Sequence, residues 1–157
     1  ANELRAICTS HFIRQRSSKL NALFNLKRSG FNPTVVFDVG AQVGTPELYN
    51  AYPDAHHVFI EPVAECLPIL NDIAGQLKSA TVVNCAVSNV NGTTSLSVTP
   101  SRQYSSIDTK MGDESREIEV KTVDSIYEDI HIEGPVLLKI DVDGIHCIHP
   151  AILLIVL

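Results

Sequence analysis

The 157-residue sequence has little positive charge and no block of it. Lysine and arginine number 12 against 18 aspartate and glutamate residues, so the formal net charge at pH 7 is −6. Basic residues stand closest together at Arg14-Gln-Arg16 and Lys27-Arg28. Such short groups do not make the basic patch that neutralises a phosphate backbone. We therefore do not expect nucleic acid as a partner.

The chain also lacks closely spaced cysteines and long apolar runs. Its four cysteines show no Cys-x-x-Cys spacing, which we interpret as free thiols in a reducing compartment rather than a disulfide framework. The closing run Ala151–Leu157 has seven residues, far fewer than the roughly 20 that span a bilayer. The first residues contain no apolar segment of the signal-peptide type. These features predict a cytoplasmic protein without a membrane span.

The sequence does contain enough apolar residues for a core. Hydrophobic residues make up 45% and charged residues 19%, which is the composition of a folded domain. The length suits one domain. Apolar positions recur at three- and four-residue intervals from Glu3 to Arg28, which predicts one or two amphipathic helices. We expect residues 1–30 to be a helical segment that packs on a domain of residues 31–157.

The stretch Val35–Gly44 carries the first functional signal. Val35–Val39 is an apolar, β-branched run broken only by Asp38, which predicts a strand buried on both faces of a parallel sheet. Gly40 and Gly44 bracket a turn into a helix predicted at Pro46–Tyr52. Glycine lets the backbone turn sharply and approach a bound molecule. Such a strand, carboxylate and turn are typical of a nucleotide-cofactor site in an open α/β sheet.

The spacing of these glycines helps to choose the cofactor. A dinucleotide fingerprint, Gly-x-Gly-x-x-Gly, would place pyrophosphate on the helix N-terminus, but here the glycines are four residues apart and Asp38 precedes the first. A carboxylate repels phosphate and suits an amino group and a sulfonium, which favours S-adenosylmethionine. A nicotinamide-dependent oxidoreductase is the disfavoured alternative. Glu61, which ends the predicted strand His57–Ile60, can accept ribose hydroxyls of either cofactor.

Helices and strands continue to alternate after Glu61. We predict a helix at Ala64–Leu77, a strand at Thr81–Cys85 and a hairpin turn at Asn91-Gly92. Two paired strands follow at Thr94–Val98 and Glu117–Val123, with a loop at Thr99–Arg116 between them. A helix at Val123–Ile130 then leads to a fourth sheet strand at Val136–Asp141. Ligands of parallel sheets bind beyond the carboxyl ends of the strands. Asp38, Glu61 and Asp141 therefore converge on one crevice. Lys139 points to the same side as Asp141, either as its ion-pair partner or as a functional group.

Five motifs, taken in order, resemble the FkbM-type S-adenosylmethionine-dependent methyltransferases. They are Asp-Val-Gly-Ala-Gln-Val-Gly from Asp38, Tyr-Pro-Asp-Ala from Tyr52, Ile-Glu-Pro from Ile60, Asn-Cys-Ala-Val-Ser from Asn84 and Leu-Lys-Ile-Asp-Val-Asp-Gly from Leu138. The resemblance covers about residues 23–144. It implies an α/β, Rossmann-like class I methyltransferase fold, with a mostly parallel sheet and helices on both faces. It also implies O-methylation of a hydroxyl on a small molecule or glycan.

The resemblance and the strand ends together define a candidate site. Its predicted cofactor-binding residues are Asp38, Gly40, Ala41, Gly44, Glu61, Asn84 and Ala86, and its predicted catalytic residues are Asp141 and Lys139. Asn84-Cys85-Ala86 lies at the C-terminal edge of the third strand, where an adenine ring would sit, although a plain strand-end turn explains Asn84 equally well. A hydroxyl acceptor must lose its proton, so Asp141 is the candidate general base or metal ligand.

Two features near the C-terminus leave alternatives. Potential ligands gather at Asp141, Asp143, His146, Cys147 and His149, but no spacing matches a named zinc motif, so we predict a polar loop and no metal site. The chain ends soon after the fourth strand, whereas class I methyltransferase folds have three further strands. The fourth strand would then be a sheet edge open to a second copy of the chain, unless Ile152–Val156 pairs beside it. The alternative function is a truncated homologue that acts as a binding or assembly module.

Overall fold

The computed structural model describes residues 19–98, 105–107, 114–141 and 153–156, which form two sheets. The central sheet has the strand order β3-β2-β1-β8-β9, and the smaller sheet has the order β4-β7-β5-β6. The central strands are β1 (Val35–Val39), β2 (His56–Ile60), β3 (Ala80–Val83), β8 (Val136–Ile140) and β9 (Leu153–Val156). The smaller sheet contains β4 (Ala86–Val87), β5 (Gly92–Val98), β6 (Ser105–Ile107) and β7 (Glu114–Lys121).

The central sheet is parallel throughout its described strands. β1 lies between β2 and β8, and all five of its residues are buried. A strand covered on both faces needs apolar residues at nearly every position, which explains why Val35–Val39 is apolar apart from Asp38. The predicted α/β, Rossmann-like fold with a mainly parallel sheet is confirmed.

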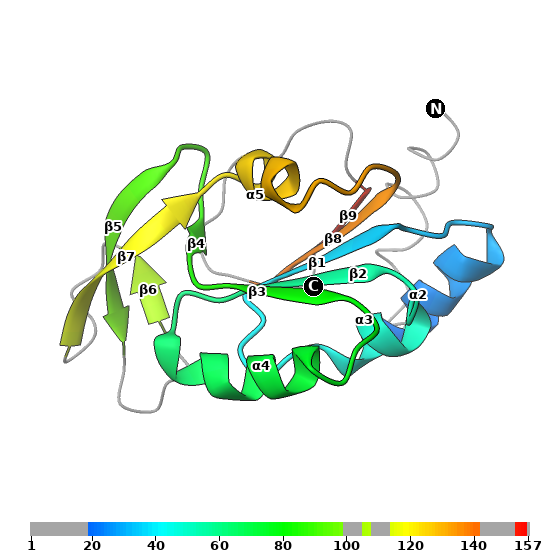
Figure 1. The fold of residues 1–157 in the computed structure, drawn as a ribbon, viewed down its shortest axis with the longest axis horizontal. Coiled ribbons are helices and arrows are strands. Elements are labelled where there is room, and N and C mark those ends of the chain that lie inside the picture. The colour runs from blue at the N-terminus through cyan, green and yellow to red at the C-terminus, as the bar shows by residue number, and fades with distance from the viewer. Residues whose placement is uncertain (1–18, 99–104, 108–113, 142–152, 157) are drawn as a thin grey trace.

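Helices cover both faces of this sheet (Figure 1). α2 (Lys19–Arg28), α3 (Pro46–Ala51) and α4 (Leu67–Ala74) lie on one face, and α5 (Val123–Ile130) lies on the other. The smaller sheet stands beside the end at which β2 leads into the short 3-10 helix η1 (Ala64–Cys66). Since β2 runs towards that end, the smaller sheet borders the carboxyl ends of the central strands.

Side chains of β1 alternate between the two helical layers. Phe37 packs in one cluster with Ile126 of α5, whereas Val36 packs with Leu48 of α3. Because side chains two residues apart in a strand share a face, Asp38 belongs to the layer of Val36. The charged group thus lies on the face that α2, α3 and α4 cover.

The prediction of a hairpin at Asn91-Gly92 is wrong. β4 and β5 are not neighbours, because β7 lies between them in the smaller sheet. The Asn91 Oδ1 atom instead accepts hydrogen bonds from the Thr122 backbone N–H at 2.7 Å and from the Ser125 hydroxyl at 3.1 Å. Thr122 Oγ1 in turn accepts from the Ser125 N–H. Asn91 therefore stabilises the start of α5.

Several predicted boundaries also change. The helix predicted at 64–77 is divided into η1 and α4, and α4 ends where the Gly75 N–H donates to Asn71 O. The third strand ends at Val83, because Cys85 already leads into β4. The loop predicted at 99–116 contains β6 and the first residues of β7, which pairs antiparallel with β5. Residues 99–104 and 108–113 lie outside the described part.

The sheet continues beyond the fourth predicted strand. β9 pairs parallel with β8, with Leu138 opposite Leu154, so the alternative pairing considered for Ile152–Val156 is the one found. β8 is consequently not a sheet edge in the described structure, which corrects the expectation of truncation at that strand. At the other end of the chain, α2 confirms the last part of the predicted N-terminal helical segment. Residues 1–18 lie outside the described part, and the division into residues 1–30 and 31–157 stays a prediction.

The buried His57 on β2 yields a test of this packing. The His57 Nε2 atom lies 2.9 Å from Tyr52 O, and burial lowers the pKa of the imidazole below its ordinary value of 6.5. The unfolded state therefore takes up a proton more readily, so His57 contributes stability that is present above about pH 6.5 and is lost as the pH falls. The variant His57→Gln provides a side-chain N–H donor in place of that of the imidazole, but it cannot take up a proton. In urea unfolding between about pH 7.5 and pH 5, the wild type should lose more stability than this variant, and parallel pH profiles would contradict this burial.

Candidate functional site

A buried ion pair joins the two central strands at the carboxyl end of the sheet. In the parallel register of β1 and β8, Asp38 stands opposite Lys139. The Lys139 Nζ atom lies 2.8 Å from Asp38 Oδ1, and the two side chains are only 2–3% exposed. Removal of two charges from water is costly unless they are paired. The pair therefore places an ammonium and a carboxylate together at the centre of the candidate site.

Lys139 directs its protons mainly at the turn after β1. Its Nζ donates to Gly40 O at 3.2 Å and to Val39 O at 3.4 Å, and it lies 3.7 Å from Asp141 Oδ2. Lys139 pairs with Asp38 Oδ1, whereas the other carboxylate oxygen, Asp38 Oδ2, is buried without a hydrogen-bond donor among the described residues. Buried polar atoms normally have hydrogen-bond partners. Asp38 therefore retains the capacity to accept hydrogen bonds from a ligand.

The loop between the glycines is tied down by its own backbone. The N–H groups of Gly40 and Ala41 both donate to Ile60 O, the Gly44 N–H donates to Ala41 O, and the Gln42 N–H donates to Glu61 Oε2. Gly40, Gln42 and Gly44 have φ angles of 70°, 47° and 83°, a region that favours glycine. These inward-directed amides do not form the cradle of free N–H groups that binds phosphate.

Glu61 lies where the ribose-binding acid was predicted and also supports this loop. Its Oε2 accepts from Gln42 N and its Oε1 accepts from Val63 N, each at 2.9 Å. Burial raises the pKa of Glu61, while the two backbone hydrogen bonds and Lys139 oppose that rise. Each carboxylate oxygen has a second acceptor position. The side chain can therefore organise the loop and still accept hydrogen bonds.

The remaining predicted cofactor residues have different surroundings. The Asn84 amide donates to Glu61 O at 2.7 Å and to Pro62 O at 3.1 Å, so it closes the turn after β2. Ala41 is buried against Phe59 and Leu70, and Ala86 is a buried residue of β4. The structure thus brings Asn84 next to Glu61. Ala41 packs towards α4, and its side chain is part of the core.

Asp141 is the accessible acid of the site. It follows β8, its backbone N–H donates to Val39 O at 3.1 Å, and its side chain is half exposed. Its Oδ2 atom lies 3.7 Å from two ammonium groups, that of buried Lys139 and that of Lys19 at the start of α2. Among the predicted catalytic residues, Asp141 can meet a substrate from solvent, whereas Lys139 is enclosed by protein oxygens.

Tyr49 of α3 is a site residue that the sequence analysis missed. A Cβ atom at Gly44 would lie 3.5 Å from the Tyr49 hydroxyl, and the Tyr49 ring packs edge-on against His57 and Phe59. Burial, followed by the charges of Asp38 and Glu47, raises the pKa of Tyr49. The phenol thus stays protonated beside the glycine turn. The sequence did not predict this contact of Tyr49 with the glycine turn, because the contact depends on how α3 packs on β2.

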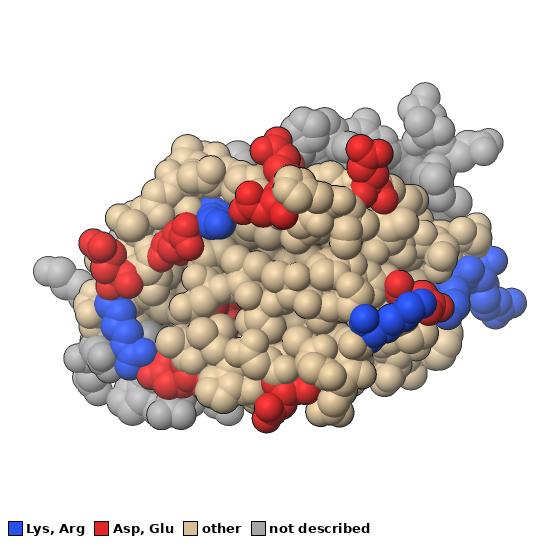
Figure 2. Space-filling model, viewed as in Figure 1, with Lys and Arg blue, Asp and Glu red and all other residues tan. Residues whose placement is uncertain are grey.

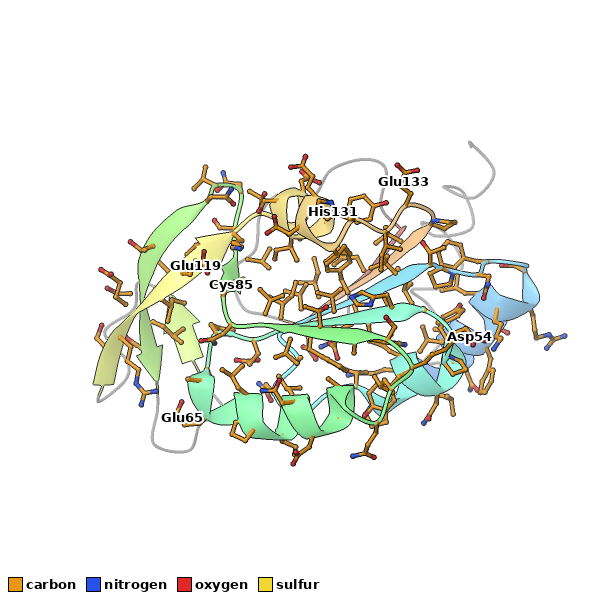
Figure 3. The ribbon with its side chains drawn as sticks, viewed as in Figure 1. Asp54, Glu65, Cys85, Glu119, His131 and Glu133 are labelled. Carbon is orange, nitrogen blue, oxygen red and sulfur yellow. The ribbon has the colours of Figure 1, made fainter. Side chains whose placement is uncertain are left out.

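The smaller sheet is anchored next to Glu61. Val63 packs with Leu96 of β5 in a buried cluster that includes Ile118 of β7. An ion pair of 2.7 Å joins Arg116 of β7 to Glu65 of η1. Figure 3 shows Glu65 at this end of the molecule and Asp54 at the opposite end. The smaller sheet therefore forms a fixed wall beside the carboxyl ends of the central strands.

Other surface features lie away from the strand ends that carry the candidate site. A hollow of about 410 Å³ lies between α5 and the edge of the central sheet, and it is lined by His56, Thr81, Val83, Lys121, Ile126, Asp129 and Ile130. On the face shown in Figure 2, basic side chains alternate with acidic ones around the periphery. No helix in the described ranges is long and apolar enough to cross a membrane.

The potential metal ligands and the cysteines of the sequence lie only partly within the described residues. The described residues contain no group of three or more His, Cys, Asp or Glu side chains that could hold a metal ion. Of the ligands that the sequence grouped, Asp143, His146, Cys147 and His149 lie outside the described ranges. Cys85 is a buried free thiol, and burial raises its pKa to about 11.

The fold and the residues at the strand ends together define a class of protein. A parallel sheet with acids at the ends of neighbouring strands and a glycine turn after the first strand is the arrangement of an α/β enzyme that binds a nucleotide-type cofactor. The family described as the methyltransferase FkbM domain matches residues 38–145. The chain belongs to this family of methyltransferases. A comparison with curated proteins and with solved structures finds no match.

The glycine turn can be tested by a matched pair of alanine substitutions. At Gly44, φ is +83° and an added Cβ would lie 3.0 Å from Ile73 Cδ1, so Gly44→Ala should destabilise the fold by about 1–3 kcal/mol. At Gly92, an added Cβ would meet nothing within 4 Å, so Gly92→Ala should be neutral or slightly stabilising. Urea unfolding measures both. Equal effects would show that the turn after β1 is not constrained as described.

Proposed function

We propose that this domain binds S-adenosylmethionine at the carboxyl ends of β1, β2 and β8 and transfers its methyl group to a hydroxyl of a small molecule or glycan. The family membership supports a methyltransferase in general. The observation that carries the choice of cofactor is Asp38, a buried carboxylate whose Oδ2 atom lacks a hydrogen-bond donor in the described structure. Such a group suits the ammonium and sulfonium of the methionine part of this cofactor.

The loop hydrogen bonds support the same choice over a nicotinamide dinucleotide. A dinucleotide places its pyrophosphate against free amides at a helix N-terminus. Here the N–H groups of Gly40, Ala41, Gln42 and Gly44 donate to protein oxygens, and a buried carboxylate lies beneath the turn. Phosphate would therefore meet negative charge and few donors. The oxidoreductase alternative is disfavoured by geometry as well as by spacing.

The other residues have complementary roles in the proposal. Gly40, Ala41 and Gly44 shape the turn that lets the cofactor approach the backbone. Glu61 would accept the ribose hydroxyls through the acceptor positions that Gln42 and Val63 leave free. Asn84 and Ala86 would border the adenine, with Asn84 acting through the turn that its amide holds.

Methyl transfer requires a collinear donor and acceptor and exclusion of water. When bound, S-adenosylmethionine supplies a methyl group activated by its sulfonium. Asp38 and Glu61 would hold the cofactor, and Asp141 would take the proton that the acceptor hydroxyl loses on methylation, with S-adenosylhomocysteine as the other product. The half-exposed side chain of Asp141 suits this role of general base. The free thiol of Cys85 supports a cytoplasmic location.

The alternative of a binding or assembly module, like a homo-oligomer, depends on an exposed edge of the central sheet. β9 lies beside β8, so β8 is not that edge, and β9 is the outer strand among the described residues. We favour catalysis over assembly because the family to which the chain belongs is one of methyltransferases.

The experiment is a calorimetric titration with S-adenosylhomocysteine, the product form of the cofactor. The wild type should bind it with a Kd in the micromolar range, which corresponds to roughly −8 kcal/mol. Asp38→Asn should weaken binding at least about tenfold, because a charged hydrogen-bond acceptor is lost. Asp54→Asn is the matched control, because Asp54 is exposed and pairs with Lys78 at the far end of the sheet. A folded wild type that binds NAD but not S-adenosylhomocysteine would overturn the proposal.

A further inference from the structure

Lys139 occupies a position between two carboxylates that have different proposed tasks. Its Nζ is 2.8 Å from Asp38 Oδ1 and 3.7 Å from Asp141 Oδ2. Asp38 lies on the side of the methyl donor, and Asp141 lies on the side of the acceptor. A single buried cation thus stands between the donor site and the proposed base.

The contacts of this ammonium are unequal. Two of its hydrogen bonds go to the carbonyls of Val39 and Gly40, and Asp38 Oδ1 at 2.8 Å is much closer to it than Asp141 Oδ2 at 3.7 Å. An ammonium has three protons, so one remains for either carboxylate. The lysine side chain has four rotatable carbon–carbon bonds, and a small rotation at its end is enough to change the preferred partner.

A cofactor ammonium at Asp38 would change the balance between these partners. Two cations beside one buried carboxylate repel each other strongly, because the surroundings screen charge poorly. Lys139 is enclosed by protein and cannot move into solvent. Asp141 Oδ2 lies 3.7 Å from the Lys139 Nζ atom, and Asp141 follows β8 two residues after Lys139, on the same side of the sheet.

We propose that Lys139 is a positioning residue that neutralises Asp38 in the free protein and moves towards Asp141 when the cationic end of the cofactor pairs with Asp38. This inference rests on the proposed function. It gives Lys139 no contact with substrate, in contrast to the catalytic role predicted from the sequence. Arrival of the cofactor thereby brings a positive charge to Asp141 and couples the donor site to the acceptor site.

Lys19 provides a matched control for this coupling. Its Nζ lies at the same distance, 3.7 Å, from the same Asp141 oxygen. Unlike Lys139, it is 41% exposed and extends from α2. If only the net charge beside Asp141 matters, the two lysines should behave alike. If Lys139 moves between the carboxylates, only its loss should uncouple them.

The test is a double-mutant cycle in the affinity for S-adenosylhomocysteine, which carries the same ammonium group. In the wild type, Asp141→Asn should weaken binding about fivefold or more, because the displaced Lys139 loses its second partner. In the Lys139→Met background, Asp141→Asn should change the affinity less than about twofold. In the Lys19→Met background, the full effect of Asp141→Asn should remain. Equal effects of Asp141→Asn in all three backgrounds would overturn the inference.

Loss of Lys139 leaves Asp38 buried and unpaired, which can unfold the protein. A crystal structure of the wild type with bound S-adenosylhomocysteine therefore provides a second test. The inference predicts that Lys139 Nζ lies within hydrogen-bond distance of Asp141 and farther from Asp38 than 2.8 Å. A lysine that stays on Asp38 would overturn it. A folded wild type without affinity for S-adenosylhomocysteine would contradict the proposed function itself, and the inference with it.

Discussion

The ion pair between Asp38 and Lys139 is the interaction on which the candidate site depends. It connects two strands that are 100 residues apart in the chain, and both of its charged groups are buried. Buried ion pairs add little net stability, because desolvation offsets their attraction. An apolar pair at these positions would therefore serve the fold as well. The pair instead holds charge at the end of β1 and fixes the carbonyls of the glycine turn.

Direct contacts connect this ion pair to the other residues of the candidate site. The turn held by Lys139 presents its amides to Ile60 and Glu61 at the end of β2. Glu61 then binds Val63, and Val63 packs on the smaller sheet. The sequence of contacts runs from β8 through β1 and β2 to β5, so the strand ends and the wall beside them form one rigid frame. A site of this kind positions a cofactor without a large change in the backbone.

Much of the central sheet could be predicted from local patterns. Val35–Val39 and Val136–Ile140 are apolar apart from Asp38 and Lys139, and such nearly continuous runs identify buried parallel strands. The smaller sheet was harder, because the two-residue β4 is too short for any periodicity and β6 lies within a polar stretch. The hairpin at Asn91-Gly92 was predicted from turn chemistry alone, whereas β7 inserts between the strands through long-range pairing.

The site was predictable in its residue types but less so in its connections. The acids Asp38, Glu61 and Asp141 follow from strand ends. The position of Asp38 opposite Lys139 depends on parallel register, and the contact of Tyr49 with the glycine turn depends on helix packing. Neither of these two contacts can be recognised from a local sequence pattern. The use of both Glu61 oxygens by backbone amides is likewise a property of the folded turn.

The central claim is that the strand ends around Asp38 bind the methyl donor, and a nuclear magnetic resonance titration tests it most directly. The chain has a mass of 17.1 kDa, which suits amide spectra of a ¹⁵N-labelled sample. On addition of S-adenosylhomocysteine, we expect saturable shifts of the amide signals of residues 38–44, 61–63 and 84–86. Shifts confined to the hollow around His56, Thr81 and Ile130, or no shifts in a folded sample, would contradict the account.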